Sequence, residues 1–87
     1  MQAIIFKEPG SPEVLIPETR PVPDPGQGEV RIRVMAAGVN RPDIFQRQGK
    51  YPAPPGVPAD IPGLEVAGFI DQIGTGVKQS AVGDAVC

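Results

Sequence analysis

The chain has 87 residues, of which 40% are hydrophobic and 5% aromatic, and its formal net charge is −2. This length allows one small domain at most, with a thin core. Acidic and basic residues are mixed without a charged block, which argues against a nucleic-acid surface or a polybasic membrane surface. No apolar run is long enough for a membrane span or a signal-peptide core, so we expect a soluble cytoplasmic protein.

The N-terminal part of the chain predicts short strands separated by turns. Residues 3–6 form the first expected strand, which Pro9-Gly10 follows, and residues 14–16 form the second, which Pro17 ends. Residues 21–28 are rich in proline and glycine and predict an extended loop. From residue 30, period-two alternation predicts a half-buried strand. Its apolar positions are Val30, Ile32, Val34 and Ala36, with Arg31, Arg33 and Met35 between them.

Residues 41–48 carry the signals of a short helix. Pro42 lies in the first turn, where a missing N–H is tolerated, and Asn40 is a suitable capping residue before it. Gly49 can adopt the left-handed conformation that ends many helices. We therefore expect one helix, with a start signal at Asn40 and Pro42 and an end signal at Gly49.

The second half of the chain begins with a proline-rich loop. Residues 51–62 include five prolines, which exclude regular structure there. Residues 65–73 predict a strand, Gly74-Thr75-Gly76 a turn, and residues 85–87 a further short strand. The fold class is therefore mainly β with one short helix. Because a half-built sheet exposes unpaired edges, we expect the chain to be part of something larger.

Four motifs support a family resemblance. They are Gly38-Val39-Asn40-Arg41-Pro42-Asp43, Gln46-Arg47-Gln48-Gly49-Lys50-Tyr51, Gly63-Leu64-Glu65-Val66-Ala67-Gly68 and Ile73-Gly74-Thr75-Gly76-Val77. Together they resemble the N-terminal catalytic-domain segment of the medium-chain dehydrogenase/reductase superfamily. Within it, they are most similar to the zinc-free quinone oxidoreductases of the zeta-crystallin and p53-inducible types.

The resemblance implies a GroES-like partial barrel over residues 1–87, incomplete without C-terminal parts. In such enzymes a Rossmann domain, absent from this chain, holds NADPH. The implied activity is hydride or electron transfer from NADPH to a quinone or an activated enone, in an enzyme that is a homodimer at full length. Because NADPH would be bound mainly by the absent domain, we expect this segment alone to be inactive.

Zinc chemistry is not expected from these residues. A catalytic zinc site needs three protein ligands, usually Cys, His or acidic residues. The chain has no His, and Cys87 is its single Cys. By the resemblance, zinc-dependent members carry Cys at the place of Asn40 and His at the place of Leu64, and only Glu65 of that pattern remains. Glu65 is interpreted as a remnant of this pattern more readily than as a catalytic acid.

Asn40 and Tyr51 are the candidate catalytic residues. The Asn40 amide can donate and accept hydrogen bonds, and the resemblance implies that it lies beside the nicotinamide as a cofactor-binding residue. Its alternative role, compatible with the first, is to cap the helix. The Tyr51 hydroxyl can bond a quinone oxygen while its ring stacks on the substrate. Alternatively, this side chain simply packs on prolines.

Phe45 and Leu64 are the candidate substrate-pocket residues. Leu64 presents an apolar side chain in place of a metal ligand, which suits a quinone or an enone. Phe45 falls where some relatives direct a tyrosine toward the active site, although a helical phenylalanine is more often a core residue. Two functional alternatives stay open: a free-standing GroES-like binding or assembly module, and the segment of an enoyl reductase.

Overall fold

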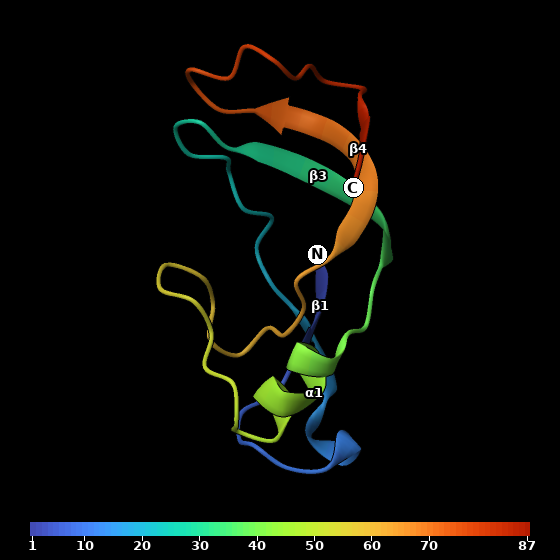
Figure 1. The fold of residues 1–87 in the computed structure, drawn as a ribbon. Coiled ribbons are helices and arrows are strands. Elements are labelled where there is room, and N and C mark those ends of the chain that lie inside the picture. Colours follow the sequence, from blue (N-terminus) through green and yellow to red (C-terminus); the bar gives the residue numbers. More distant parts are fainter. The chain divides into compact units, whose positions relative to one another are not determined.

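The protein is described by a computed structural model that covers all residues 1–87. It is mainly β with one short helix, so the predicted fold class is confirmed (Figure 1). The chain forms two compact units, each built from two separated stretches. The first unit comprises Met1–Pro21 and Val39–Leu64, and the second comprises Val22–Gly38 and Glu65–Cys87.

The first unit begins with a two-stranded antiparallel sheet. Strand β1 (Gln2–Ile5) pairs with β2 (Ile16–Thr19), and the 3₁₀-helix η1 (Pro12–Val14) lies between them in the chain. The prediction of a strand over residues 14–16 was wrong, because Val14 ends η1 and Pro17 lies inside β2. A proline is tolerated here because each strand of a two-stranded sheet has an unpaired edge, where no ladder bond needs its N–H.

Helix α1 (Arg41–Arg47) confirms the predicted helix, and both of its ends are fixed by local bonds. At its start, Asn40 and Asp43 form a capping box, in which the Asn40 N–H donates to Asp43 Oδ2 at 2.9 Å. At its end, Gly49 has a φ of +81°. The Lys50 N–H donates to the Phe45 carbonyl at 2.7 Å, and the Gly49 N–H donates to the Gln46 carbonyl at 3.0 Å. These two bonds form the Schellman motif, so the helix cannot extend further.

The C-terminal end of α1 is also attached to the N-terminal stretch of the same unit. The Gly10 N–H donates to the Arg47 carbonyl at 2.9 Å, and Arg47 Nη1 donates to the Gly10 carbonyl at 3.0 Å. A Cβ at Gly49 would lie 3.1 Å from the Pro9 ring. The helix is thus held in place by the segment that leads into η1.

The loop of residues 51–62 contains no helix or strand, as its prolines predict. It is nevertheless bonded to the N-terminal hairpin. The Phe6 N–H donates to the Asp60 carbonyl at 3.0 Å, and Arg20 Nη2 donates to Asp60 Oδ2 at 2.5 Å. Ile5 and Phe6, which are 0% and 9% exposed, form the apolar core of this unit. The hairpin therefore fixes one end of the loop.

The second unit is a three-stranded antiparallel sheet in the order β3-β4-β5. Its strands are β3 (Val30–Ala37), β4 (Val66–Ile73) and β5 (Ala85–Val86). Ile70, the one large buried side chain in this sheet, lies opposite Ile32. The turn at residues 74–76 is confirmed. Its Thr75 carbonyl accepts a hydrogen bond at 2.8 Å from the N–H of Gly28, which lies just before β3.

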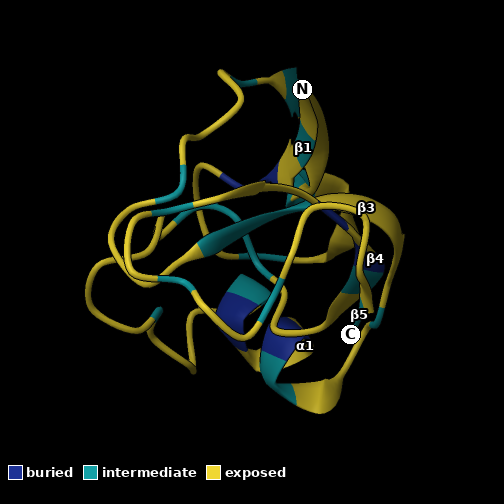
Figure 2. Cartoon of the chain, turned by 90° about the horizontal axis from the view of Figure 1, so that it is seen from above, coloured by how far each residue is buried: buried dark blue, intermediate teal, exposed yellow.

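The predicted alternation of β3 holds only in part. Ile32 is half-buried and Arg33 is exposed, but Val34 is 52% exposed despite its expected inward position. The pairing of β3 with β4 shifts between Val34 and Ala36. Such an irregularity changes the direction of the following side chains. Most residues of the chain are exposed, as Figure 2 shows.

Neither of the helices has the length and apolar character that a bilayer span requires.

Candidate functional site

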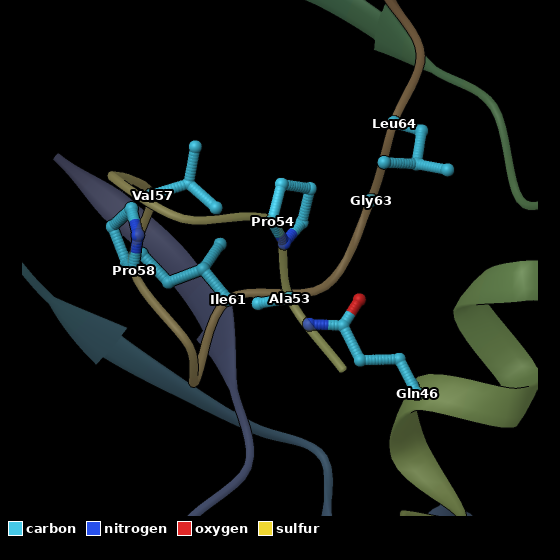
Figure 3. A pocket seen from close by; sticks show the side chains of 8 residues that line it. All are labelled: Gln46, Ala53, Pro54, Val57, Pro58, Ile61, Gly63 and Leu64. Atoms are coloured by element: carbon cyan, nitrogen blue, oxygen red, sulfur yellow. The ribbon is translucent and has the colours of Figure 1, made fainter. Parts of the chain in front are cut away.

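A pocket of about 300 Å³ lies within the first unit, between the C-terminal half of α1 and the proline-rich loop that follows it (Figure 3). Its walls are mostly apolar, and no charged side chain lines it. The lining residues are Gln46, Ala53, Pro54, Val57, Pro58, Ile61, Gly63 and Leu64. Pockets of this volume and character bind small, mostly apolar molecules.

Gln46 is the one polar side chain of this pocket. It extends from α1, and its terminal amide is directed toward Ala53 and Pro54 (Figure 3). The residue is only 7% exposed, which is unusual for a glutamine. Gln46 was not among the predicted site residues, because nothing in the sequence distinguishes it from Gln48, which is exposed two residues later.

Leu64, predicted as a substrate-pocket residue, does line this pocket. Its side chain is 55% exposed, so it forms part of the pocket rim. It follows Gly63, whose φ of +124° is a conformation that side-chain-bearing residues rarely adopt. The glycine before Leu64 therefore sets the path by which the chain leaves the loop.

Asn40 lies at the N-terminal cap of α1 and is exposed, so the capping interpretation is confirmed. Asp43, its capping partner, is only 9% exposed, and the Oδ1 atom of Asp43 is buried without a hydrogen-bond partner. Asp43 and Gln46 are the two buried residues of α1, and their spacing of three places them on one helix face. This face carries polar groups into the unit.

Phe45 and Tyr51 lie outside the pocket. They are 38% and 39% exposed, and neither they nor Asn40 line it. The exposed ring of Phe45 argues against the alternative that it is a core residue. Of the four predicted site residues, the structure thus places Leu64 in a pocket and the other three on the surface of the same unit.

Glu65 belongs to the second unit, where it is packed against Gly38. The Gly38 N–H donates to the Glu65 carbonyl at 3.0 Å. A Cβ at Gly38 would lie 1.8 Å from Glu65 Oε1, so the carboxylate occupies the space of a missing side chain. Glycine at this position therefore allows the close approach of the Glu65 side chain.

The electrostatics of the first unit are dominated by Arg20. Its hydrogen bond to Asp60 lowers the pKa of that carboxyl below its usual value. Arg20 also donates to Glu18, so both neighbouring carboxylates are paired with one guanidinium. Nowhere in the chain do three or more His, Cys, Asp or Glu side chains gather as a metal site would require.

A family model described as the alcohol dehydrogenase GroES-like domain matches residues 26–87. A 2-haloacrylate reductase of a Burkholderia species is 39% identical over the whole chain, which covers 26% of that protein. The crystal structure of Escherichia coli quinone oxidoreductase complexed with NADPH is 36% identical, with a TM-score of 0.86 over 98% of this chain and 26% of that one.

Alcohol dehydrogenases are also among the similar structures. The cobalt- and zinc-bound thermostable alcohol dehydrogenase from Pyrobaculum aerophilum is 40% identical, with a TM-score of 0.86 over 98% of this chain and 25% of that one. The chain spans about a quarter of the length of these relatives. The similarity therefore covers one segment of longer oxidoreductases.

Proposed function

Because the chain belongs to the family of alcohol dehydrogenase GroES-like domains, we propose that it is the N-terminal segment of an NADPH-dependent quinone oxidoreductase. Its relatives include quinone oxidoreductases and other reductases of the medium-chain dehydrogenase/reductase superfamily. In this proposal the complete enzyme reduces a quinone or an activated enone, and it does so without a catalytic zinc ion.

The apolar pocket is the observation that carries this proposal. Leu64 lines it at the place where, by resemblance, zinc-dependent members hold a ligand histidine. No charged group is present to bind a metal or an anion there. Zinc sites need several nitrogen, sulfur or carboxylate ligands, which this part of the chain does not bring together. A neutral, mostly apolar acceptor suits such walls.

The exposed residues of the same unit have separate roles in this proposal. NADPH, when bound, supplies the hydride. Asn40, exposed at the start of α1, fits a carboxamide, because a side-chain amide can both donate to it and accept from it. Tyr51, 39% exposed, donates its hydroxyl proton in a hydrogen bond to an acceptor oxygen. Leu64 provides apolar surface at the pocket rim, and Phe45 provides apolar surface outside the pocket in the same unit.

The proposal extends to the whole protein. The remaining parts of the enzyme bind most of the NADPH molecule, and two subunits associate through them. The enzyme acts in the cytoplasm. The exposed apolar side chains of this segment support the proposal, because further parts of the enzyme would cover them.

Steady-state kinetics of the complete enzyme test the proposal. The oxidation of NADPH is followed by its absorbance with 1,4-naphthoquinone as acceptor, and the oxidation of secondary alcohols is followed with NADP⁺. We expect turnover with the quinone and none with the alcohols. Turnover of alcohols that depends on zinc, without quinone reduction, would identify an alcohol dehydrogenase and refute the proposal.

A reductase of activated alkenes is the second candidate, and the 2-haloacrylate reductase among the relatives favours it. Both reactions deliver a hydride from a nicotinamide to a conjugated acceptor, so Asn40 and Tyr51 would have the same roles. Product analysis separates them: a quinone reductase forms a hydroquinone, whereas an alkene reductase saturates a carbon–carbon double bond. A free-standing binding module would form neither product.

A further inference from the structure

The pocket contains one polar side chain, Gln46, to which the proposed function assigns no role. Gln46 is 7% exposed as a residue, and it is the one polar side chain among the residues that line the pocket. In an apolar pocket such a group favours ligands that carry a hydrogen-bonding oxygen over ligands that lack one, because only the former can pair with it. The amide is therefore the side-chain group of this pocket that can distinguish ligands by a hydrogen bond.

The backbone from which the Gln46 side chain extends is fixed by its helix. The capping box holds the start of α1, and the Schellman motif uses the Gln46 carbonyl itself, which accepts from the Gly49 N–H at 3.0 Å. Because the backbone of Gln46 is held at this bond, its side chain starts from a fixed point and extends toward Ala53 and Pro54 (Figure 3). A ligand in the pocket thus meets a donor and an acceptor on a side chain that extends from a fixed backbone.

The remaining walls define the ligand. Apolar side chains of the loop and Leu64 surround the amide, and no charge is present to neutralise a carboxylate or a phosphate. The volume of about 300 Å³ is sufficient for a small molecule. The chemistry that fits is an uncharged, mainly apolar compound with one carbonyl oxygen.

We propose that Gln46 is a specificity-determining residue, whose amide N–H donates to the carbonyl oxygen of a neutral acceptor held in this pocket. This inference rests on the proposed function, because it names the part of the chain that selects the acceptor. It further predicts that the pocket binds neutral quinones and ketones more tightly than anionic acceptors such as acrylates. The amide binds and orients; it transfers no proton.

The test compares Gln46→Leu with the matched control Gln48→Leu in the complete enzyme. Both remove a glutamine amide from the same end of α1, but Gln48 is exposed and lies outside the pocket. Loss of one hydrogen bond predicts a KM for 1,4-naphthoquinone raised roughly 5- to 15-fold in Gln46→Leu and unchanged in Gln48→Leu. Equal KM values in the two variants would overturn the inference.

A second variant guards against misfolding of Gln46→Leu. Val57 is 51% exposed on the pocket wall, so Val57→Phe narrows the pocket from an exposed position. It is expected to raise the same KM roughly 5-fold or more, by excluding part of the ligand. An unchanged KM in a folded Val57→Phe enzyme shows that the acceptor does not enter this pocket.

Binding measurements distinguish this inference from the proposed function. Acetophenone, a neutral ketone, and ethylbenzene, which lacks the oxygen, are titrated by calorimetry. We expect acetophenone to bind more tightly than ethylbenzene, and Gln46→Leu to abolish the difference. Gln46-dependent binding by an enzyme that reduces no quinone supports the pocket but refutes the quinone reductase. Quinone reduction with no effect of Gln46→Leu refutes the pocket assignment alone.

Discussion

Asp43 is the single residue on which the start of α1 most depends. Its Oδ2 atom accepts the Asn40 N–H at 2.9 Å, and its negative charge lies in the first helical turn. Asp43→Ala leaves the Asn40 N–H unpaired and is expected to lower the free energy of unfolding by about 1–2 kcal/mol. Urea denaturation measures this loss. Asp24→Ala, which removes a carboxylate that is 88% exposed, is the control, with an expected change below about 0.5 kcal/mol.

Two glycines allow close approaches of different kinds, and alanine substitutions distinguish them. A Cβ at Gly68 would lie 2.0 Å from the Arg33 carbonyl oxygen, which is backbone of the paired strand. Gly68→Ala is therefore expected to cost about 2–3 kcal/mol, because β3 and β4 must separate. Gly38→Ala meets only the flexible end of Glu65 and is expected to cost about 1 kcal/mol. Thermal unfolding measures both, and equal losses would show that the strand contact is not rigid.

At the level of single residues, the sequence predicts surface chemistry better than pocket chemistry. The capping role of Asn40 depends on neighbours three residues away, so local spacing is sufficient to predict it. Gln46 and Gln48 are the same residue type on the same helix end. Only the tertiary arrangement of the loop makes one of them buried and the other exposed. No pattern within the sequence alone contains that information.

Among the secondary-structure elements, the proline-rich loop and strand β2 are joined by an ion pair that predicts a pH dependence. Arg20, which directly follows β2, lowers the pKa of Asp60 through a hydrogen bond. A carboxyl whose folded pKa is depressed stabilises the fold above its unfolded pKa, about 3.9 for Asp, and this contribution is lost as the pH falls through the folded value. Asp60→Asn is expected to be less stable than the native protein at pH 7, and this difference should shrink toward pH 3.

Urea denaturation of native protein and Asp60→Asn at both pH values measures this effect. The same measurement on Asp71→Asn provides a comparison, because this change removes a carboxylate that pairs with a different arginine, Arg31, at 2.7 Å in the other unit. A difference for Asp60→Asn that stays constant from pH 7 to pH 3 would show that the Arg20–Asp60 pair does not stabilise the loop.

Local sequence is sufficient to predict the ends of helix α1 but not the position of strand β2. Helix α1 ends where Asn40 and Gly49 predict, because both stop signals act through bonds within a few residues. Strand β2 was placed incorrectly at residues 14–16. Whether Pro17 ends a strand depends on which edge faces a partner, and that partner, β1, is distant in the sequence. Similarly, the irregular pairing that exposes Val34 arises from β4.

For the whole molecule, exposed apolar side chains indicate an incomplete surface. Within the second unit, Val34, Met35 and Phe69 are 52%, 66% and 47% exposed. The chain spans about a quarter of the length of its relatives. We expect the 87-residue segment alone to bind NADPH too weakly to saturate at micromolar concentrations. Titration of NADPH fluorescence measures this. Saturation in that range would show that the segment contains a complete cofactor site, in contrast to our proposal.

The proposal that the acceptor site works without zinc is tested by the rate of quinone reduction after the complete enzyme has been stripped of metal with 1,10-phenanthroline. Because Asn40 and Leu64 provide no ligand set and no metal cluster forms elsewhere in the segment, we expect NADPH oxidation by 1,4-naphthoquinone to continue at its original rate. Loss of this activity on stripping, followed by its recovery when zinc is restored, would contradict the proposed mechanism.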